Sequence, residues 1–413
     1  MATQNPRKIR LAYIVSHPIQ YQADLLRQIA QDPGIDLHVF FCSDFSARAY
    51  QDAGFGVSVE WDVPLLSGYR YTVLPRWRDT TNPGPLRPIA RGILRGLRGG
   101  IHGQRFDAVW IHGYSTVNAL HAIVAARLLG LPVLLRVESW LQDRARSGAK
   151  LFAKQIFFRL LRYTVSAVLP IGTQNAAYWR AYLGPACPQF LMPYAVNNHF
   201  FASRTADAAA TRSALQTELN LDPARPVILF ASKLQQRKHC DHLLDAYLAL
   251  VAANPHTSPY LVIVGDGEMR TSLELRALSS RCEDIRFAGF RNQNQLPRFF
   301  DLATVFVLPS KHEAWGLIVN EAMAAGLPVV VSDNIGCVAD IVRNGENGYV
   351  YPVGNIAALT AALQAVLQPG TAAAMGQRSR QLIAQWTFRE DILGLRNALA
   401  HVTGLPLASQ DAA

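Results

Sequence analysis

The sequence predicts an α/β protein of two Rossmann-like domains, each with a doubly wound parallel sheet, that face each other across a cleft. Three observations support this fold class. The 413 residues exceed one ordinary core and suit two domains of about 150–200 residues each. Half of the chain is apolar and 17% is charged, which is typical of globular proteins. Short β-branched runs alternate with longer helical patterns, as parallel sheets require.

Ten short apolar runs are expected to be strands. Those of the first sheet are residues 11–16, 37–42, 108–112, 133–137 and 167–171, and those of the second are 227–231, 261–265, 285–288, 305–309 and 328–332. Many are apolar on both faces, which indicates strands covered by helices on both sides. A polar stretch between about Val196 and Pro226 marks the boundary. We expect an N-terminal domain at 1–200, a C-terminal domain at 201–385, and a helix and tail at 386–413 that pack back on the first domain.

The cysteines and the apolar runs limit the protein class. Five scattered cysteines without C-x-x-C spacing indicate neither a disulfide framework nor a zinc site, which suits a reducing compartment. The apolar run after the basic N-terminus has the length of one strand, so we expect no signal peptide. Since about 18 apolar residues nowhere run together, we expect no membrane-spanning helix.

The segment from Ser310 to Asp333 has the pattern of an anion-binding site. A loop with Glu313 turns at Gly316 into a helix that carries Glu321. A helix N-terminus presents unpaired amide donors, so the amides of Gly316 and Leu317 are expected to hold a diphosphate. Glu313 would then face the group beyond the phosphates, and Glu321 would accept bonds from a ribose diol. Two acids at this spacing also suit exposed positions, but the loop glycine and the apolar helix face favour a site.

This segment resembles glycosyltransferase family 4, whose members share the two-domain GT-B fold. The pattern Glu313-x-x-Gly316-Leu317…Glu321 is similar to the E-x7-E signature, in which the first glutamate contacts the donor sugar and the second binds the nucleotide ribose. The resemblance extends over about 160 residues, through segments 231–238, 264–267, 287–290 and 344–348.

The resemblance also implies roles for residues outside the signature. Lys233 and Lys238 would neutralise the diphosphate, and Gly289 and Phe290 would border the base pocket. Lys233 stands where the family has arginine. The planar guanidinium, which can bind two oxygens side by side, is therefore replaced by the compact charge of an ammonium group. Ser232 stands where the family has glycine. A solvated turn is the alternative for both lysines.

The first domain has candidate acceptor-side residues at the ends of its strands. His17 and Gln20 lie in the segment 16–22 after the first strand, where many relatives carry glycines. His112 ends the third strand. Glu138 follows the fourth strand, where many relatives place a histidine. A carboxylate at this position either orients an acceptor hydroxyl, opposes developing oxocarbenium charge, or pairs with a neighbouring arginine (Arg136 or Arg144).

The first domain is strongly basic. Between Arg70 and Arg162, 16 Lys and Arg stand against four acids, a balance of +12, whereas the whole chain carries +10. One stretch has arginines at helical spacing, namely Arg87, Arg91, Arg95 and Arg98. A second surrounds apolar residues with Arg144, Arg146, Lys150, Lys154, Arg159 and Arg162. Such helices either lie on an anionic membrane or pack into the core with a solvated cationic side. No recognised motif accompanies the charge, so we expect no nucleic-acid partner.

The sequence and the resemblance together predict a metal-independent glycosyltransferase without a prosthetic group, and the resemblance implies retention at the anomeric carbon. The enzyme would move a sugar from a UDP- or GDP-sugar to a glycan or lipid-linked acceptor, in bacterial surface polysaccharide or lipopolysaccharide assembly. We expect a cytoplasmic protein, peripheral on the inner face of the plasma membrane if the basic helices bind lipid. No D-x-D with strand-end context is present, so we expect no metal site.

Other functions of the same fold remain open. An epimerase would change the donor without an acceptor, and a phosphorylase would need free phosphate and a pyridoxal phosphate lysine. A non-catalytic sugar-nucleotide-binding protein would bind donor without releasing nucleoside diphosphate. A redox Rossmann enzyme is disfavoured because no G-x-G-x-x-G follows the first strand.

Overall fold

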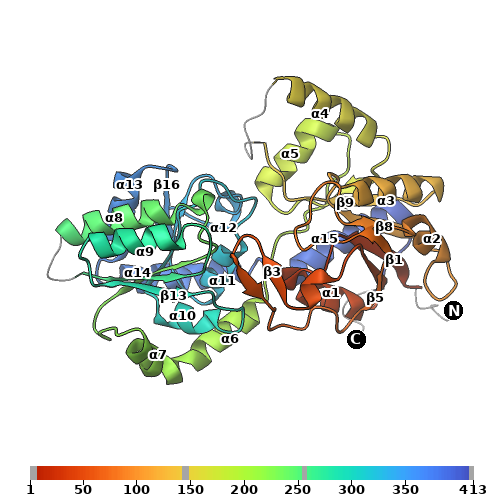
Figure 1. Ribbon diagram of the computed structural model, residues 1–413. Coiled ribbons are helices and arrows are strands. Elements are labelled where there is room, and N and C mark those ends of the chain that lie inside the picture. Colours follow the sequence, from red (N-terminus) through yellow and green to blue (C-terminus); the bar gives the residue numbers. More distant parts are fainter. Residues whose placement is uncertain (1–6, 142–147, 254–257, 409–413) are drawn as a thin grey trace. The chain divides into compact units, whose positions relative to one another are not determined.

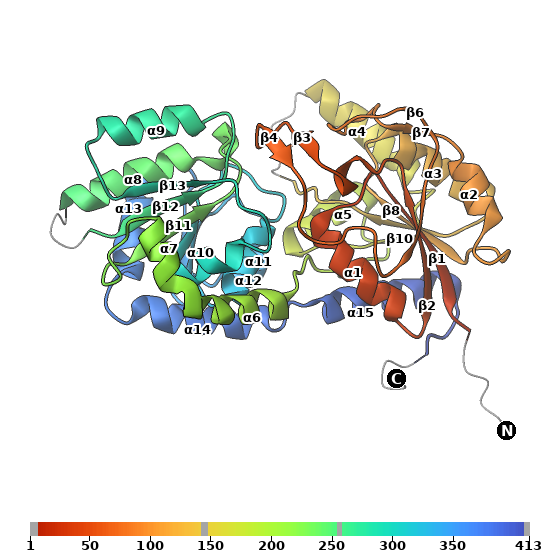
Figure 2. The same cartoon turned by 60° about the horizontal axis from the view of Figure 1, so that its bottom comes forward.

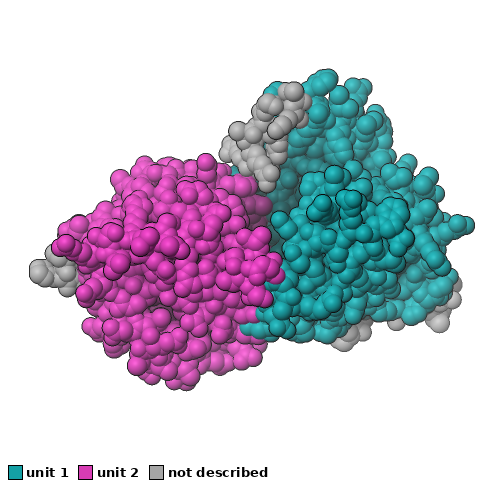
Figure 3. Space-filling model, viewed as in Figure 1, with its two compact units in different colours: residues 1–50, 59–194, 388–413 teal, residues 51–58, 195–387 magenta. Residues whose placement is uncertain are grey.

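The computed structural model describes residues 7–141, 148–253 and 258–408, except for the side chains of residues 149 and 150. The chain divides into two compact units, which Figure 1 shows as a ribbon and Figure 3 in separate colours. Unit 1 comprises residues 1–50, 59–194 and 388–413, and unit 2 comprises residues 51–58 and 195–387. Each unit contains one six-stranded sheet whose neighbouring strands are parallel, which confirms the predicted fold class of two doubly wound domains.

The sheet of unit 1 has the strand order β10-β9-β8-β1-β2-β5. Its strands are β1 (Ile9–Val15), β2 (Ile35–Phe41), β5 (Arg70–Val73), β8 (Ala108–His112), β9 (Val133–Arg136) and β10 (Ala167–Val168). Two two-stranded sheets accompany it, one of β3 (Tyr50–Asp52) and β4 (Val57–Val59), and one of β6 (Arg76–Arg78) and β7 (Ile89–Ala90). The hairpin tip at 51–58 belongs to unit 2 by its contacts, which the sequence did not indicate.

The helices of unit 1 are α1 (Gln20–Gln31), α2 (Ile93–Gly99), α3 (Val117–Leu128), α4 (Gly148–Leu161), α5 (Thr173–Leu183) and α15 (Phe388–Thr403). The buried core joins the sheet to α3, α4 and α5 through Val109, Ala122, Phe158 and Trp179. Helix α15 contacts α1 (Figure 2), and Arg396 of α15 pairs with the buried Asp32 carboxylate at 2.5 Å. The last helix is therefore part of this unit's structure.

The sheet of unit 2 has the order β13-β12-β11-β14-β15-β16. Its strands are β11 (Val227–Ala231), β12 (Tyr260–Val264), β13 (Ile285–Gly289), β14 (Val305–Leu308), β15 (Val329–Ser332) and β16 (Gly348–Tyr351). Its helices are α6 (Asn198–Ala208), α7 (Arg212–Glu218), α8 (Cys240–Ala253), α9 (Arg270–Ser279), α10 (Leu296–Leu302), α11 (Leu317–Ala324), α12 (Val338–Ile341), α13 (Ile356–Val366) and α14 (Thr371–Ile383). Four of its strands are buried along their whole length, as strands covered on both faces must be.

The structure corrects two expectations about individual elements. Each sheet has a sixth strand, β5 or β16, which the sequence did not predict. Both lie at sheet edges and include partly or fully exposed residues, so they lack the apolar run of the inner strands. The arginines at 87, 91, 95 and 98 do not share one helix, because α2 begins only at Ile93. Residues Arg144 and Arg146 lie outside the described residues, as does the side chain of Lys150.

Within the described ranges, no single helix is both long and apolar enough to cross a membrane. One bent pair, residues 356–366 with 371–403, passes that test by length and composition only.

Candidate functional site

The loop between β14 and α11 brings the signature residues of unit 2 together. Gly316 takes φ +96°, a left-handed conformation that favours glycine, and it immediately precedes the first residue of α11, Leu317. A Cβ at position 316 would lie 3.0 Å from Cγ2 of Ile335, so a larger residue would also crowd the following loop. No side chain of the described residues caps this helix, so its first amides remain available as donors to an anion.

Glu313 is held by cations before the loop reaches Gly316. Its carboxylate accepts from Ser310 Oγ at 3.0 Å and from Arg237 Nη1 at 3.1 Å, and it also pairs with Lys238. Burial opposes ionisation, but Lys238 and Arg237 outweigh it and hold the pKa of Glu313 below its usual value. Glu313 is therefore an anion within a cluster whose other charged members are cations.

The two lysines assigned to the diphosphate both lie in this part of unit 2. Lys238 is buried beside Glu313, and burial lowers its pKa against the attraction of that carboxylate. Lys233 follows β11 and pairs with Asp52 at 2.7 Å, and its Nζ lies 4.5 Å above the Phe55 ring. The Lys233 charge contributes to the lowered pKa of Lys238, so the two cations are near each other. Each lysine already neutralises a carboxylate, which the sequence did not predict for Lys233.

Glu321 lies inside α11 and has the opposite electrostatic state from Glu313. Its Oε2 is buried and has no hydrogen-bond partner among the described residues. Burial raises the pKa of Glu321 to about 8, so the carboxyl is mostly protonated at neutral pH. A buried polar atom without a partner is costly, and a ligand hydroxyl would satisfy it. This environment is compatible with the predicted ribose contact.

Glycines at the ends of β12 and β13 let neighbouring loops approach closely. Gly265 donates from its amide to the Gly289 carbonyl at 2.8 Å, and a Cβ at Gly265 would lie 1.9 Å from the Ser232 carbonyl oxygen. Gly289 has φ +71°. Phe290, assigned to the base pocket, packs edge-to-face on Phe55 with ring centroids 4.7 Å apart. The Phe55 contact is a feature that periodicity could not show, since Phe55 is distant in sequence.

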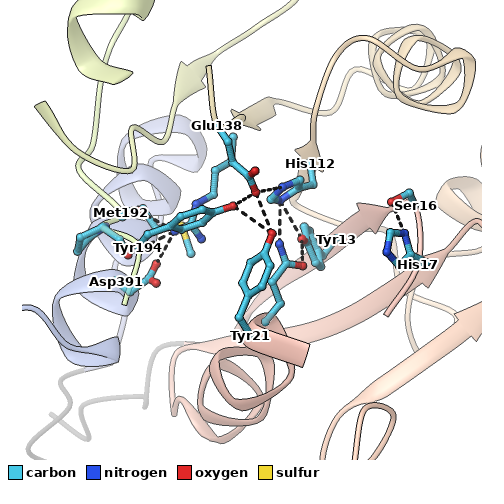
Figure 4. A network of polar contacts seen from close by, with 12 residues as sticks. Tyr13, Ser16, His17, Tyr21, His112, Glu138, Met192, Tyr194 and Asp391 are labelled. Carbon is cyan, nitrogen blue, oxygen red and sulfur yellow. Dashed lines mark hydrogen bonds and ion pairs between the residues drawn. The ribbon is translucent and has the colours of Figure 1, made fainter. Parts of the chain in front are cut away.

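Unit 1 contains a second polar cluster at the ends of β8 and β9 (Figure 4). Glu138 accepts from Tyr21 at 2.8 Å and also from Tyr194, and its Oε1 lies 3.5 Å from Nε2 of His112. Burial alone would raise its pKa, but the bond and charge of His112 and the two tyrosine hydroxyls lower the pKa of Glu138 to about 2. The carboxylate is therefore ionised and a weak base at neutral pH.

The surrounding hydrogen bonds select one tautomer of His112. Tyr13 donates its hydroxyl proton to Gln22 Oε1 at 2.8 Å, which orients the Gln22 amide so that its Nε2 donates to His112 Nδ1 at 3.2 Å. When His112 is neutral, Nδ1 accepts, so the imidazole proton resides on Nε2 and faces the Glu138 carboxylate. The Tyr13 oxygen also lies 3.1 Å from Nδ1, which completes the contacts of that nitrogen.

The structure also decides between the alternative partners of Glu138. Arg136 is 1% exposed and donates to the Met192 carbonyl at 2.8 Å, and it pairs with Asp391 at 3.4 Å. The charged partner of Arg136 is therefore Asp391 of α15 and not Glu138. Burial raises the pKa of Asp391 to about 7, although Arg136 opposes that rise. Arg144, the other candidate partner, lies outside the described residues.

His17 lies apart from the hydrogen bonds around Glu138 (Figure 4). Its Nδ1 is 2.8 Å from Ser16 Oγ, and its ring packs on Phe45 at 4.7 Å. Burial first, and the charge of His112 second, lower the pKa of His17 to about 4, so it is neutral near pH 7. Tyr21 and Gln22 contact the cluster from the start of α1, within the same segment 16–22 that the sequence singled out for His17 and Gln20.

Among the described residues, one group of metal-type ligands occurs beside Lys238. The ligand atoms of His239, Asp241 and His242 lie within 4.8 Å of one another. The two imidazoles stack with ring centroids 3.9 Å apart and an interplanar angle of 23°.

Comparisons with known proteins agree with the geometry of unit 2. Residues 211–382 match the family described as glycosyl transferases group 1. An uncharacterized glycosyltransferase of Methanocaldococcus jannaschii is 37% identical over 129 residues, which cover 30% of this chain and 32% of that protein. Glycogen synthase of Mycobacterium tuberculosis is 33% identical over 156 residues, 37% of each chain. The chain thus spans about a third of the length of these curated relatives.

A solved structure extends the similarity to both units. HepE of Anabaena in complex with UDP has a TM-score of 0.72 at 16% identity, and the match covers 95% of this chain and 100% of that one. At this identity the match concerns the fold. Residues 211–382 thus resemble the glycosyl transferases group 1 family, and the two parallel sheets of the chain have the GT-B fold.

Proposed function

We propose that the protein is a retaining glycosyltransferase that moves a sugar from a nucleoside diphosphate sugar to an acceptor hydroxyl. The observation that carries this proposal is the cluster of Lys238, Arg237 and Glu313 beside the uncapped start of α11, within the residues that match the family. Cations and oriented amides oppose the charge that grows on a departing diphosphate. Retention of configuration is what the resemblance to the family implies.

The roles proposed for the acidic residues follow from their different environments. Glu313 positions the donor sugar and Glu321 binds the ribose. Lys233, Lys238 and the amides of Gly316 and Leu317 stabilise the diphosphate, and Gly289 and Phe290 border the base. Such a cationic site supplies charge stabilisation from the protein itself, so we propose that activity persists with a chelator present. Activity that requires added Mn²⁺ would contradict this.

The acceptor side is proposed for unit 1, through Glu138, His112 and His17. A carboxylate with a pKa of about 2 is poorly suited to remove a proton at neutral pH. This favours the two electrostatic roles for Glu138, namely orienting a hydroxyl and opposing positive charge on the sugar ring. We propose a glycan or lipid-linked acceptor in bacterial surface polysaccharide or lipopolysaccharide assembly, and a cytoplasmic location.

UDP-sugars are the first donors to test, because the related Anabaena structures were solved with UDP and with UDP-glucose. Thermal melting of the full chain with UDP-, GDP- and dTDP-sugars should show stabilisation by one base class, since a ligand of the folded state raises the melting temperature. Release of nucleoside diphosphate with an acceptor mixture then separates transfer from binding alone. Stabilisation without any release would favour the non-catalytic alternative, and donor conversion without acceptor would indicate an epimerase.

Replacement of Glu313 tests the assignment directly. Glu313→Gln keeps the side-chain shape and removes the charge between Lys238 and Arg237. We expect kcat to fall by roughly 10²–10³, the range for losing one electrostatic contact to a transition state. Glu346→Gln is the matched control, because that glutamate is exposed and pairs with Arg378. Wild-type turnover by Glu313→Gln would refute the assignment.

A further inference from the structure

Helix α4 presents apolar residues on two faces. Phe158 and Leu161 are buried in the core of unit 1. Phe152, Ile156 and Leu160 are 64%, 47% and 65% exposed. Their spacing of four residues places them on one line along the helix, away from the core. The sequence left open whether the apolar residues of this helix all belong to the core. The structure shows that Phe158 and Leu161 do, whereas Phe152, Ile156 and Leu160 are exposed.

Two arginines accompany this exposed line. Arg159 lies on the helix, which has no acidic residue, and Arg162 follows it. Lys154 instead places its Nζ 4.1 Å over the Tyr182 ring, where it is buried. Arg159 and Arg162 line a hollow of about 350 Å³ between α4 and α5, together with Gln155, Ala181 and Tyr182. Tyr163, 67% exposed, lies just beyond. A hollow lined by two arginines is suited to a phosphate group.

The exposed line (Phe152, Ile156, Leu160, Tyr163) and the arginine hollow are together named the α4 surface. We propose that the α4 surface docks on an anionic lipid bilayer. The apolar side chains would enter the interfacial layer while Arg159 and Arg162 meet lipid phosphates, which is how basic amphipathic helices bind membranes. The excess of 16 basic over four acidic residues between Arg70 and Arg162 adds attraction of the same sign.

Charge favours a bilayer over a second copy of the chain. A symmetric dimer through α4 would set the helix against itself, so Arg159 would approach cations and no acidic residue of α4. An anionic bilayer meets the same cations with opposite charge. The α4 surface belongs to unit 1 and the donor cluster to unit 2, so this proposal does not rest on the proposed transfer, and the two are tested separately.

The test is co-sedimentation of the full chain with lipid vesicles at low salt. We expect binding to vesicles with a quarter phosphatidylglycerol in phosphatidylcholine, at least tenfold more than to phosphatidylcholine alone, and weaker binding in 0.5 M salt. The double variants Phe152→Ser/Leu160→Ser and Arg159→Gln/Arg162→Gln should each lower binding at least tenfold. The melting temperature without ligand should stay unchanged in both variants, which shows that they fold.

Matched controls come from unit 2. Leu275→Ser/Leu278→Ser changes two leucines that are 60% and 77% exposed on α9, and Arg281→Gln/Arg343→Gln removes two exposed arginines. These variants should bind vesicles as the wild type does. The proposal is overturned if the wild type ignores anionic vesicles at low salt or if the controls lose binding equally. It is also overturned if the α4 variants turn a dimer into a monomer without changing lipid binding.

Discussion

At the scale of single residues, two carboxyl groups are tuned in opposite directions. The pKa of Glu138 falls to about 2 because His112, Tyr194 and Tyr21 stabilise its charge against the effect of burial. The pKa of Glu321 rises to about 8 because burial acts on it without a compensating donor. Both residues were singled out from the sequence, yet their protonation states follow from neighbours that only the fold supplies.

The raised pKa of Glu321 makes stability depend on pH. The folded pKa of about 8 exceeds the usual 4.5, so the unfolded chain ionises first as pH rises. The contribution of Glu321 to stability is therefore full below pH 4.5 and is lost as pH rises to about 8, at no more than about 1.4 kcal/mol per pH unit. Glu321→Gln removes this effect. Between pH 5 and pH 8, the melting temperature of the variant should rise steadily relative to that of the wild type. If the two melting temperatures change in parallel with pH, burial does not raise the pKa of Glu321.

The tautomer of His112 depends on Gln22. Gln22→Met would leave the Tyr13 hydroxyl, 3.1 Å away, as the partner of His112 Nδ1, and because a hydroxyl can donate or accept, both tautomers become accessible. We expect the ¹⁵N shifts of the His112 ring to move from the Nε2–H pattern toward a mixture. Transfer should fall by at least tenfold if His112 acts as proposed. The exposed Gln28 of the same helix provides the control Gln28→Met, and unchanged His112 shifts in Gln22→Met would show that Gln22 does not select the tautomer.

At the scale of elements, strands with a clear apolar run were predictable and strands without one were not. All ten predicted strands occur, including β10 and β13 at sheet edges. The edge strands β5 and β16 were missed because they are short and include partly or fully exposed residues. The loop-to-helix turn at Gly316 follows from a glycine that the backbone requires there.

Helix α15 makes a contact that no sequence pattern specifies. Gly394 lies so close to the segment that follows α5 that a Cβ on Gly394 would be 1.8 Å from the Leu191 carbonyl oxygen. Gly394→Ala should therefore destabilise the protein by about 1–3 kcal/mol, because backbone must shift to admit the methyl group. Gly99→Ala, in α2, meets nothing within 4 Å and should be neutral or stabilising by up to about 1 kcal/mol. Denaturant unfolding of both variants measures the difference, and equal stabilities would exclude the close packing of α15.

At the scale of the whole molecule, unit 1 is assembled from separate parts of the chain. Its last part supplies Asp391 to the buried Arg136 and Arg396 to the buried Asp32. Removing one partner of a buried ion pair such as Arg396–Asp32 costs about 3–5 kcal/mol. The polypeptide segments that join the units run side by side, since the Asn198 side chain donates to the Trp386 carbonyl at 3.2 Å.

Truncation tests this discontinuous assembly. A fragment of residues 1–194 should melt without cooperativity and bind a hydrophobic dye, because Arg136 and Asp32 lose their partners. Joining residues 388–413 to it through a short Gly/Ser linker should restore a cooperative transition followed by circular dichroism. The arrangement is wrong if the two forms melt alike.

The sequence by itself determined the class of the fold and the position of the candidate donor loop. Alternating apolar runs, a required glycine and two spaced glutamates are local features that hold in whatever way distant segments pack. Only the tertiary structure decided the partners: Asp52 with Lys233, Asp391 with Arg136, Tyr194 with Glu138, and which apolar residues of α4 stay exposed. Each of these joins positions far apart in the chain, or depends on what covers a helix face, and neither is encoded in local periodicity.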